Sequence, residues 1–430
     1  MKTTFLASLF SIADAASLVA AGDAPPHANL PPAAEGTPSM FRPVLNVRDF
    51  GAKGDGKTDD TDALVKALEA AGKPDPANPG RNFPATVFIP AGTYRITKTI
   101  AMDARVQAAR IEGEGALASR TGFRTMLIWD GPEGGHLFNV RGYMALRLGE
   151  LALDGGKKAG TLLRINSIQG IGTGLWYFER LHLANADTGV ELGADLDNCA
   201  SDMTFVDCNF RDLKSAAFRT MANQNVDYVF IRCIASWVPI GFHFVKGGNA
   251  HFILPAFGRV RTAIKIDATG GGINGGVFSI TGLQLETFNY DSEKKRFVIL
   301  DAAGETNVSF QTIYTGCGQV WGPDGDYETP NFVLGPSAQV AIRDSMISGR
   351  IAKLTGAKGQ PATWLQIENC RFRCASDPRK DIVADEFSGY ELRNCQVIVD
   401  DTKAQDYNAS CKPLMLRRLV KYPEDLPIED

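Results

Sequence analysis

The sequence has no strong excess of one charge and no apolar run long enough to cross a bilayer. Its 49 acidic residues nearly balance 45 basic ones, for a net charge of -4. This balance excludes the overall basic field that is typical of proteins bound to nucleic acid or to membrane surfaces. No apolar run reaches the roughly 18 residues that a transmembrane helix requires. We therefore expect no nucleic-acid partner and no membrane span.

The eight cysteines also lack the paired spacing of a metal site. No CxxC pair occurs, and Cys370 with Cys374 alone makes a poor zinc signature. We predict no metal site from the cysteines, and no cofactor is firmly implied.

The N-terminus resembles a short secretory signal, with Lys2 before an apolar stretch at 5–12 and small residues at 13–15. Residues 16–43 are rich in proline and are expected to form an extended linker. The fold is expected to span residues 44–410, with an N-terminal cap at 44–110 and a tail at 411–430. These features predict a secreted or periplasmic protein.

The chain repeats itself about every 25 residues. Cys208 and Cys233 are 25 positions apart, as are Ser345, Cys370 and Cys395, and each follows a short β-prone run. Such a period, with short strands and turns in place of helices, predicts a β-solenoid whose equivalent residues stack along the axis. We interpret the repeated cysteines as small apolar fillers of an internal stack.

A second phase of the repeat carries apolar-x-apolar triplets. Because strand side chains alternate between faces, the flanking residues point inward and the middle residue points outward. The middle residues predict an external row of side chains, which we call the ladder: Asn139, Arg164, Glu191, Arg219, His243 and Lys265. Later triplets centred on Val298 and Val333 are apolar, so the polar row is expected to end after Lys265. These outward valines predict cover by a loop or by another subunit, as in a homo-oligomer.

The runs "NVRDFGAKGDGKTDDTDAL" at 46–64 and "VFIPAGTYRITKTI" at 87–100 resemble the N-terminal signature of the pectate-lyase superfamily. With the repeats, the resemblance covers residues 44–399. It implies an all-β, right-handed parallel β-helix, and it implies a polysaccharide lyase or a glycoside hydrolase without deciding between them.

The polygalacturonase-type hydrolases of this superfamily are a poor match. Their Asn-Thr-Asp element appears only as Asn185, Ala186 and Asp187. Of their paired aspartates, only Asp212 is present here, and a leucine follows it. Their Gly-His-Gly is absent at 239–241, and their Arg-Ile-Lys survives only as Ile264 and Lys265.

The ladder favours β-elimination on an acidic, uronic-acid-containing polysaccharide. Such a lyase needs groups that neutralise the substrate carboxylate, a base and a proton donor. Arg219 and Arg164 can bind the carboxylate in a bidentate manner. His243, between Arg219 and Lys265, is the candidate base, since like charge favours its neutral form. Lys265 is the alternative base or the acid, and Asn139 is a further substrate contact.

Two alternatives remain open. A glycoside hydrolase of this fold would use Asp187 and Glu191, with Glu286 as a weaker partner. A non-catalytic, tailspike-like binding protein would use exposed aromatics such as Trp176, Trp237 and Trp321, of which Trp237 is also a substrate-binding candidate of the enzyme.

A calcium ion, which lyases of this fold commonly use, requires several clustered oxygen atoms. Glu191 and Asp187 alone make a poor site, and Asp154, Asp195 and Asp197 are better interpreted as turn residues.

The densest acidic cluster, at 49–62, is interpreted as structural. It precedes the run "TDALVKALEAA", whose apolar residues recur at helical spacing. This run predicts a helix that covers the N-terminal end of the solenoid, with Thr58 or Asp59 as its cap and Gly72 as its stop.

Overall fold

The computed structural model describes residues 44–72, 85–103, 110–116, 122–142, 144–168, 172–194, 200–267, 276–286, 297–314, 329–373, 381–400 and 403–411. The signal and linker predictions for residues 1–43, and the tail beyond residue 411, lie outside them. Among the described residues, no helix is both long and apolar enough to cross a membrane.

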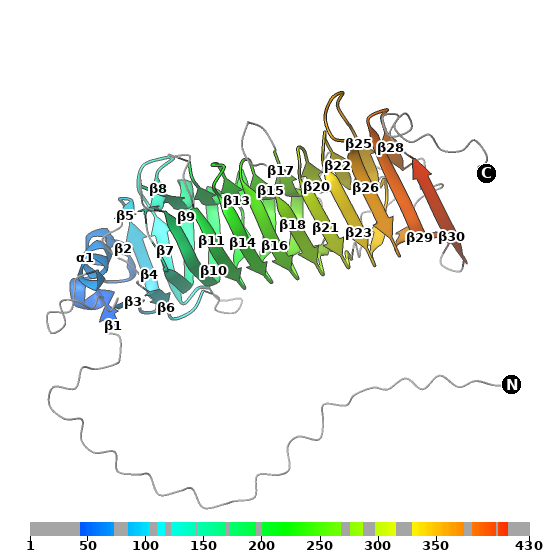
Figure 1. The fold of residues 1–430 in the computed structure, drawn as a ribbon. Coiled ribbons are helices and arrows are strands. Elements are labelled where there is room, and N and C mark those ends of the chain that lie inside the picture. The colour runs from blue at the N-terminus through cyan, green and yellow to red at the C-terminus, as the bar shows by residue number, and fades with distance from the viewer. Residues whose placement is uncertain are drawn as a thin grey trace, which may run out of the picture. The chain divides into compact units, whose positions relative to one another are not determined.

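The described chain is nearly all-β, and its strands pair in parallel with strands of the next coil (Figure 1). Three series of strands follow one another around each coil. Five long strands turn corners and contribute to more than one series: β9 (Arg147–Asn166), β10 (Thr173–Leu192), β15 (Ile234–Phe244), β17 (Ala256–Ile266) and β29 (Ser388–Asp400).

The ladder series carries the predicted ladder. Besides parts of β9, β10, β15 and β17 it comprises β5 (Ile100–Met102), β8 (His136–Arg141), β13 (Ala216–Thr220), β20 (Val298–Ala302), β22 (Phe332–Leu334), β25 (Ala352–Leu354) and β28 (Ile382–Ala384).

The front series is the row of long arrows that faces the viewer in Figure 1. Besides parts of β9, β10 and β29 it comprises β3 (Thr86–Ile89), β6 (Arg110–Gly113), β11 (Ala200–Val206), β14 (Val226–Ile231), β16 (Gly248–Ile253), β18 (Val277–Thr281), β21 (Asn307–Gln311), β23 (Gln339–Arg343) and β26 (Thr363–Glu368). The strand β1 (Val44–Asn46) joins it through β3.

The third series comprises parts of the long strands with β2 (Asp55–Asp59), β4 (Gly92–Ile96), β7 (Thr125–Trp129), β12 (Asn209–Arg211), β19 (Gln284–Glu286), β24 (Met346–Ser348) and β27 (Arg371–Arg373).

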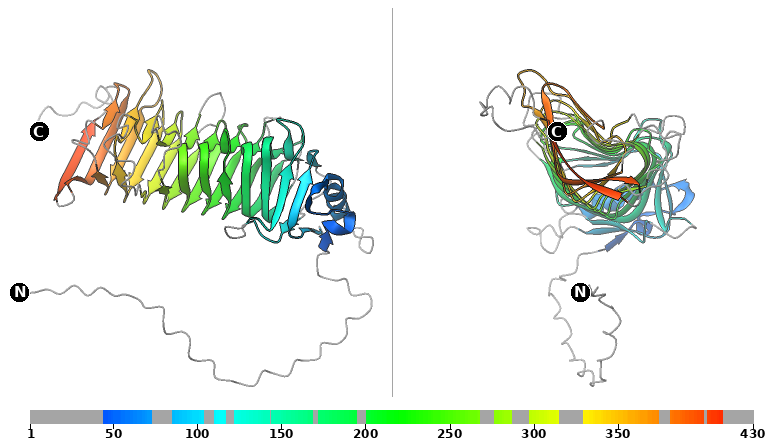
Figure 2. Two further views of the ribbon diagram at one scale, coloured as in Figure 1. Left: turned by 180° about the vertical axis from the view of Figure 1, so that it is seen from behind. Right: turned by 90° about the vertical axis from the view of Figure 1, so that its right-hand side faces the viewer.

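The inward-facing side chains of the three series fill one common interior. The right-hand view of Figure 2 shows the backbone of the coils around it end-on. In the front series, Phe178, Phe205, Phe230 and Phe252 occupy equivalent positions of β10, β11, β14 and β16. Their rings stack with centroids 4.3, 5.0 and 4.8 Å apart. Parallel pairing in register therefore turns a repeat of phenylalanine in the sequence into a continuous aromatic stack.

The repeated cysteines lie inside this core. Cys208, Cys233, Cys370 and Cys395 are buried free thiols. Burial raises the pKa of the Cys370 thiol to about 12, which keeps it protonated and unreactive. The prediction of an internal stack is confirmed for these four.

The residue before each stacked cysteine adopts a left-handed conformation. Asp207, Arg232, Asn369 and Asn394 all have φ between 50° and 54°. Asp and Asn tolerate this region better than most residues, which explains their recurrence at this corner.

The helix α1 (Thr61–Ala71) forms where the sequence predicts it. Leu64, Ala67, Leu68 and Ala71 are buried in the same core as the first strands. Asp59 accepts hydrogen bonds from the backbone N–H and the hydroxyl of Thr61. The N-cap residue is Asp60, whose side chain makes no cap hydrogen bond, so the prediction of Thr58 or Asp59 as the cap is wrong, whereas Gly72 ends the helix as expected.

The acidic cluster before the helix is structural. Asp60 accepts from the backbone N–H groups of Lys53 and Gly54, and Asp55 accepts from those of Lys57 and Thr58. These bonds to the Asp55 carboxylate, first of all that from Thr58, lower its pKa to about 2.

The last pair departs from the parallel pattern, since β30 (Lys403–Cys411) runs antiparallel to β29.

Candidate functional site

The ladder residues stand on neighbouring strands in register. Asn139 pairs with Arg164, Arg164 with Glu191, Glu191 with Arg219, Arg219 with His243, and His243 with Lys265. The flanking residues on each strand are buried, for example Phe242 and Phe244 around His243. The prediction that one face gathers these six residues is confirmed, whereas their chemical roles stay predictions.

The prediction that the polar row ends after Lys265 is wrong. Lys265 pairs with Asp301, and Val298 pairs instead with Thr262, three positions earlier in β17. The outward triplet of β20 is therefore Leu300, Asp301 and Ala302. Beyond it the row continues with the half-buried Val333 and with Lys353.

The first half of the ladder is a closed ion-pair cluster. Glu191 is only 7% exposed, although it lies on the outward row. Its carboxylate accepts a hydrogen bond from Nη2 of Arg219 at 2.5 Å, and its other oxygen lies 3.6 Å from Nε of Arg164. The two arginines cover the carboxylate of Glu191. Because they share this anion, the positive charge that each arginine presents at the surface of the ladder is partly neutralised.

The second half centres on a carboxylate that the sequence analysis missed. Oδ2 of Asp267 lies 2.7 Å from Nε2 of His243, and Oδ1 lies 3.2 Å from Nζ of Lys265. His243 therefore faces an anion as well as the two cations considered from the sequence. The alternation of strand side chains between two faces predicts the position of Asp267, because Asp267 follows Lys265 by two positions and therefore shares its face.

Asp267 and Asp301 have pKa values displaced in opposite directions. The hydrogen bond from His243 is the main cause that lowers the pKa of Asp267, and Lys265 adds to it. Burial is the main cause that raises the pKa of Asp301, and the negative charge of Asp267 raises it further, against the attraction of Lys265 and His243. One carboxyl is thus held ionised while its neighbour is biased toward the neutral acid.

The two carboxyl groups come from neighbouring coils. Asp301 pairs with Lys265 across the parallel strands, and Asp267 follows Lys265 by two positions, on the same face.

Asp187 and Glu191, the carboxylate pair that the sequence offers for a hydrolase, are both engaged in ion pairs. Asp187 lies four positions before Glu191 in the same strand, β10, and forms an exposed ion pair with Lys214 at 3.0 Å. Glu191 is enclosed by its arginines and Asp187 is paired with Lys214, so each carboxylate already has a cationic partner, and their joint role in hydrolysis stays a prediction. The side chain of Glu286 lies outside the described side chains.

The aromatic candidates for sugar binding differ in their exposure. Trp176 is buried, so its use as an exposed sugar platform is wrong, and Trp321 lies outside the described residues. Trp237 is 37% exposed, and the Arg259 guanidinium lies 3.8 Å from the centre of its ring. It stands in β15 at the corner that leads to His243, so it borders the ladder.

At the ladder's start, Asn139 has a buried Oδ1 that accepts no hydrogen bond from the part of the chain that the structure describes.

No group of three or more metal-ligating side chains occurs among the described residues. Asp154 accepts from the backbone N–H of Gly156 and from the amide of Asn185, as expected of a turn residue. Asp195 and Asp197 lie outside the described residues. The side chains present thus make no calcium site around Glu191 and Asp187.

Comparison with known proteins agrees with the fold. Residues 44–130 match the family model described as rhamnogalacturonase A/epimerase, pectate lyase-like. The resemblance to the pectate-lyase superfamily is confirmed. A curated relative, alginate lyase 7 of Azotobacter vinelandii, is 56% identical over 52 residues, which are 12% of this chain and 5% of the relative. A glucan 1,3-beta-glucosidase of Cochliobolus carbonum is 42% identical over 62 residues, 14% of this chain and 8% of the relative. The chain thus matches only a small part of either protein.

Two solved structures share the fold over most of this chain. The catalytic unit of a GH87 alpha-1,3-glucanase from Streptomyces thermodiastaticus has a TM-score of 0.52 at 14% identity, over 82% of this chain and 69% of that one. The A-module of mannuronan C-5 epimerase AlgE4 from Azotobacter vinelandii has a TM-score of 0.50 at 17% identity, over 82% and 95%. At such identity the likeness shows the fold alone.

Proposed function

We propose that this protein is a carbohydrate-active enzyme that cleaves a polysaccharide at the second half of the ladder. Asp301 serves as the general acid and Asp267 as the general base. The observation that carries the proposal is a pair of carboxyl groups from neighbouring coils, Asp267 in contact with His243 and Lys265 and Asp301 in register with Lys265, whose pKa values are displaced in opposite directions. The carbohydrate-acting names of the relatives support the substrate class.

Hydrolysis at this site has a direct chemical route. The neutral Asp301 donates its proton to the glycosidic oxygen as the bond to the sugar breaks. The ionised Asp267 takes a proton from the water that attacks the opposite face of the sugar ring. His243 and Lys265 position Asp267 and stabilise its charge through the contacts of 2.7 and 3.2 Å.

β-Elimination on an acidic polysaccharide is the second candidate, because Arg219, His243 and Lys265 occupy three successive rungs. In this route the substrate carboxylate displaces Glu191 from Arg219, His243 removes the proton beside the carboxylate, and Lys265 or Asp301 protonates the leaving oxygen.

The proposal also includes the handedness of the coils, the cover of their N-terminal end and the export of the protein. The coils form a right-handed β-helix, and α1 covers its N-terminal end, supported by the burial of Leu64, Ala67 and Leu68 against the first strands. The residues before Val44 direct the protein to the periplasm or the medium.

Product analysis tests the proposal. The full chain is incubated with neutral glucans and with polyuronates, and products are followed by new reducing ends and by the near-ultraviolet absorbance of an unsaturated uronate. Hydrolysis predicts reducing ends without that absorbance, and elimination predicts both. If neither new reducing ends nor the absorbance of an unsaturated uronate appeared with any substrate of the panel, the proposal of an enzyme would be overturned in favour of a binding protein.

A further inference from the structure

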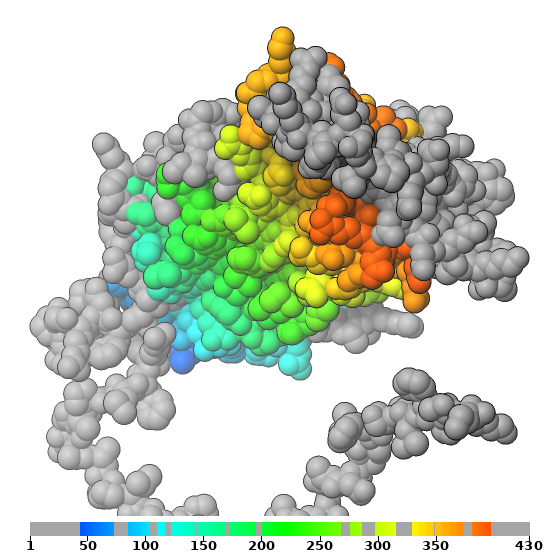
Figure 3. Space-filling view, turned by 45° about the vertical axis from the view of Figure 1, so that its right-hand side comes forward, coloured from blue at the N-terminus to red at the C-terminus, as the bar shows by residue number. Residues whose placement is uncertain are grey.

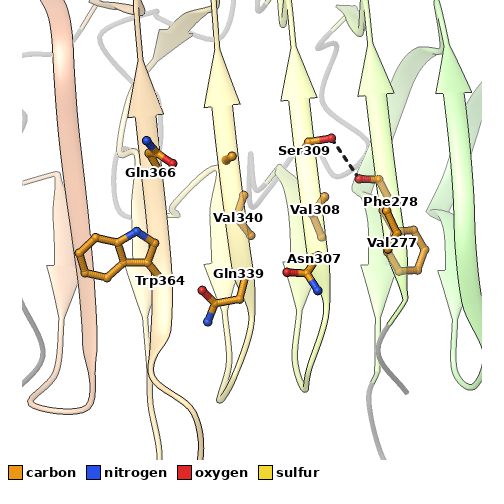
Figure 4. Close-up of a pocket in the computed structure, with 10 residues that line it drawn as sticks. Val277, Phe278, Asn307, Val308, Ser309, Gln339, Val340, Trp364 and Gln366 are labelled. Carbon is orange, nitrogen blue, oxygen red and sulfur yellow. Dashed lines mark hydrogen bonds between the residues drawn. The ribbon is translucent and has the colours of Figure 1, made fainter. Parts of the chain in front are cut away.

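The front series carries a hollow on its outward face that the ladder does not use. It is open to the surface, has a volume of about 280 Å³ and spans four neighbouring strands, β18, β21, β23 and β26. Figure 3 shows this face, where the coloured bands of successive strands lie next to one another, and Figure 4 shows the side chains that line the hollow. The ladder series forms a separate part of each coil, so the hollow is distinct from the proposed catalytic site.

The hollow is formed by small side chains between larger ones. Two outward rows run across the four strands in register, Val277–Asn307–Gln339–Trp364 and Ser279–Ser309–Ala341–Gln366. Ser309 and Ala341 are the small members of the second row, and Trp364 and Gln366 rise beside them on β26. Rungs in register are about 4.8 Å apart, so the rows form a shallow channel across the strands.

The lining has the chemistry of a site for a neutral polar ligand. None of the ten lining residues is ionisable. Titratable side chains border the hollow. His251 stands beside Ser279 and Glu391 stands beside Gln366 in the same outward row, and Arg343 and Glu368 pair at 3.3 Å in the next row. An anionic ligand would find no cation inside the hollow, and burying a charged group there would be unfavourable.

The polar groups in the hollow can both donate and accept hydrogen bonds. Asn307 and Gln366 present amide side chains that form no hydrogen bond with any described residue, and Gln339 uses only its Nε2, which donates to the carbonyl of Ala362 at 2.6 Å. Ser309 adds a hydroxyl whose one bond, to the carbonyl of Phe278, is long at 3.4 Å. Vicinal hydroxyl groups need such mixed donors and acceptors.

Trp364 supplies a flat apolar surface beside these amides. It is half-buried, and its indole extends from β26 to the side away from Gln339 (Figure 4). Its register partner on β29 is Gly389, which has no side chain to obstruct the ring on that side. An aromatic face next to amide groups matches a pyranose ring, which has an apolar face and a rim of hydroxyls.

We propose that this hollow, lined by Asn307, Ser309, Gln339, Ala341, Trp364 and Gln366, binds a neutral oligosaccharide chain. It is a second carbohydrate site that holds a glycan on the protein at a distance from the cleaving groups. The inference does not depend on whether the ladder hydrolyses or eliminates.

Binding of defined oligosaccharides tests the site. Hexasaccharides of β-1,3-glucan, α-1,3-glucan, β-1,4-mannan and β-1,4-galactan are titrated by calorimetry into the Asp267→Asn protein, so that bound chains are not cleaved. Two further variants in that background remove the site in different ways. Trp364→Ala removes the stacking surface, and Ala341→Phe fills the hollow without removing any contact. Tyr314→Ala is the matched control, because Tyr314 is an exposed aromatic outside the hollow.

We expect at least one neutral hexasaccharide to bind, and both hollow variants to weaken it by roughly tenfold or more, as truncation of an aromatic anchor does. Tyr314→Ala should leave affinity unchanged, and thermal melting should show all variants folded. With Asp267 restored, Trp364→Ala and Ala341→Phe should retain turnover of short soluble substrates.

Three results would overturn the inference. They are no binding by any neutral hexasaccharide, unchanged affinity in both hollow variants, and preferential binding of a polyuronate that the hollow variants abolish. A change of oligomeric state in Trp364→Ala, seen by sedimentation, would instead make this face a contact between copies of the chain. If the site holds but no product forms in any assay, only the proposed function fails.

Discussion

The two halves of the ladder are built from the same parallel rungs but differ in how their charges are arranged. In the first half, Glu191 is enclosed by Arg164 and Arg219 and is 7% exposed. In the second half, Asp267 is shared by His243 and Lys265, and a second carboxyl, Asp301, follows on the next strand.

The comparison shows why a row of charged residues is not by itself a catalytic site. The carboxylate of Glu191 is bound by two arginines, and the neighbouring rungs of the ladder carry no second carboxyl group. In the second half, the hydrogen bond from His243 lowers the pKa of Asp267 and burial raises that of Asp301, so neighbouring coils present two carboxyl groups of different proton affinity. We therefore assign structure to the first half and proton transfer to the second.

The largest expected effect is the loss of the base. Asp267→Asn keeps the size of the side chain but cannot take a proton, so kcat should fall by about 10²–10⁴. Initial rates on the substrate identified in the product assay measure this. Because an amide can still contact His243 and Lys265, the fold should survive, which circular dichroism checks. A fall of kcat by less than about threefold would remove Asp267 from the mechanism.

The pH dependence of turnover separates the two routes. Asp301 must be protonated for hydrolysis, and its pKa lies above the ordinary value of 3.8. The hydrolytic rate should therefore fall as pH rises through that raised pKa, by about tenfold per unit. Elimination in which Lys265 protonates the leaving oxygen does not require a protonated Asp301, so its rate should not show this fall. A profile of kcat/KM against pH measures the difference, and a rate that rises steadily up to neutral pH would reject the hydrolytic assignment.

Neutralising Glu191 should cost stability. Glu191→Gln leaves Arg164 and Arg219 without their shared anion, and loss of a buried charged partner costs about 1–3 kcal/mol of unfolding free energy. Urea unfolding measures this loss.

Glu179→Gln is the matched control, since Glu179 also lies between two arginines, Arg147 and Arg180, but belongs to the front series. Both variants should lose stability, whereas only Glu191→Gln should change KM. Equal effects of the two on KM would contradict a role for the ladder in binding substrate.

The two carboxyls of the second half should respond to pH with opposite signs. Asp301 has a raised pKa, so its contribution to stability is present below the unfolded pKa of 3.8 and is lost as pH rises through its folded pKa. Asp267 has a lowered pKa, so its contribution is present above 3.8 and is lost as pH falls through its folded value.

At neutral pH, Asp301→Asn should therefore raise the melting temperature and Asp267→Asn should lower it, each by about 2–4 °C per kcal/mol of stability. Both differences should shrink as pH falls below 3.8. Thermal melts across this range measure them, and shifts of the same sign in both variants would contradict the assignment of acid and base.

The sequence predicted the rungs but not the cluster that makes the second half distinctive. Apolar flanks placed Arg164 to Lys265 correctly, because adjacent rungs are separated by only 22–28 positions and alternation fixes the face. Between Lys265 and Asp301 the separation is 36 positions, so the repeat no longer indicates which residue of β20 stands beside Lys265. The register there depends on the backbone pairing, and Val298 was chosen in place of Asp301.

Burial explains the other differences between the sequence predictions and the structure. Trp176 and Trp364 are both tryptophans within β-prone runs, but the alternation of their strands turns one inward and the other outward. The pKa displacement of Asp301 arises mainly from burial and then from a neighbour that is close only in space. Neither cause can be read from a single sequence.

The smallest expected effect falls on the carboxylate that the sequence analysis assigned to a hydrolase. The side chain of Asp187 is 47% exposed and pairs at 3.0 Å with that of Lys214, which is 59% exposed. Exposed ion pairs contribute about 0.2–1 kcal/mol, so Asp187→Asn should change the free energy of unfolding by less than about 1 kcal/mol. It should also leave kcat nearly unchanged, in contrast to the same substitution at Asp267, when both variants are assayed side by side. A loss of turnover in Asp187→Asn comparable to that in Asp267→Asn would move proton transfer to the first half of the ladder. The closed cluster around Glu191 would then have to open to admit substrate, because only the displacement of its arginines would free Glu191 to act with Asp187.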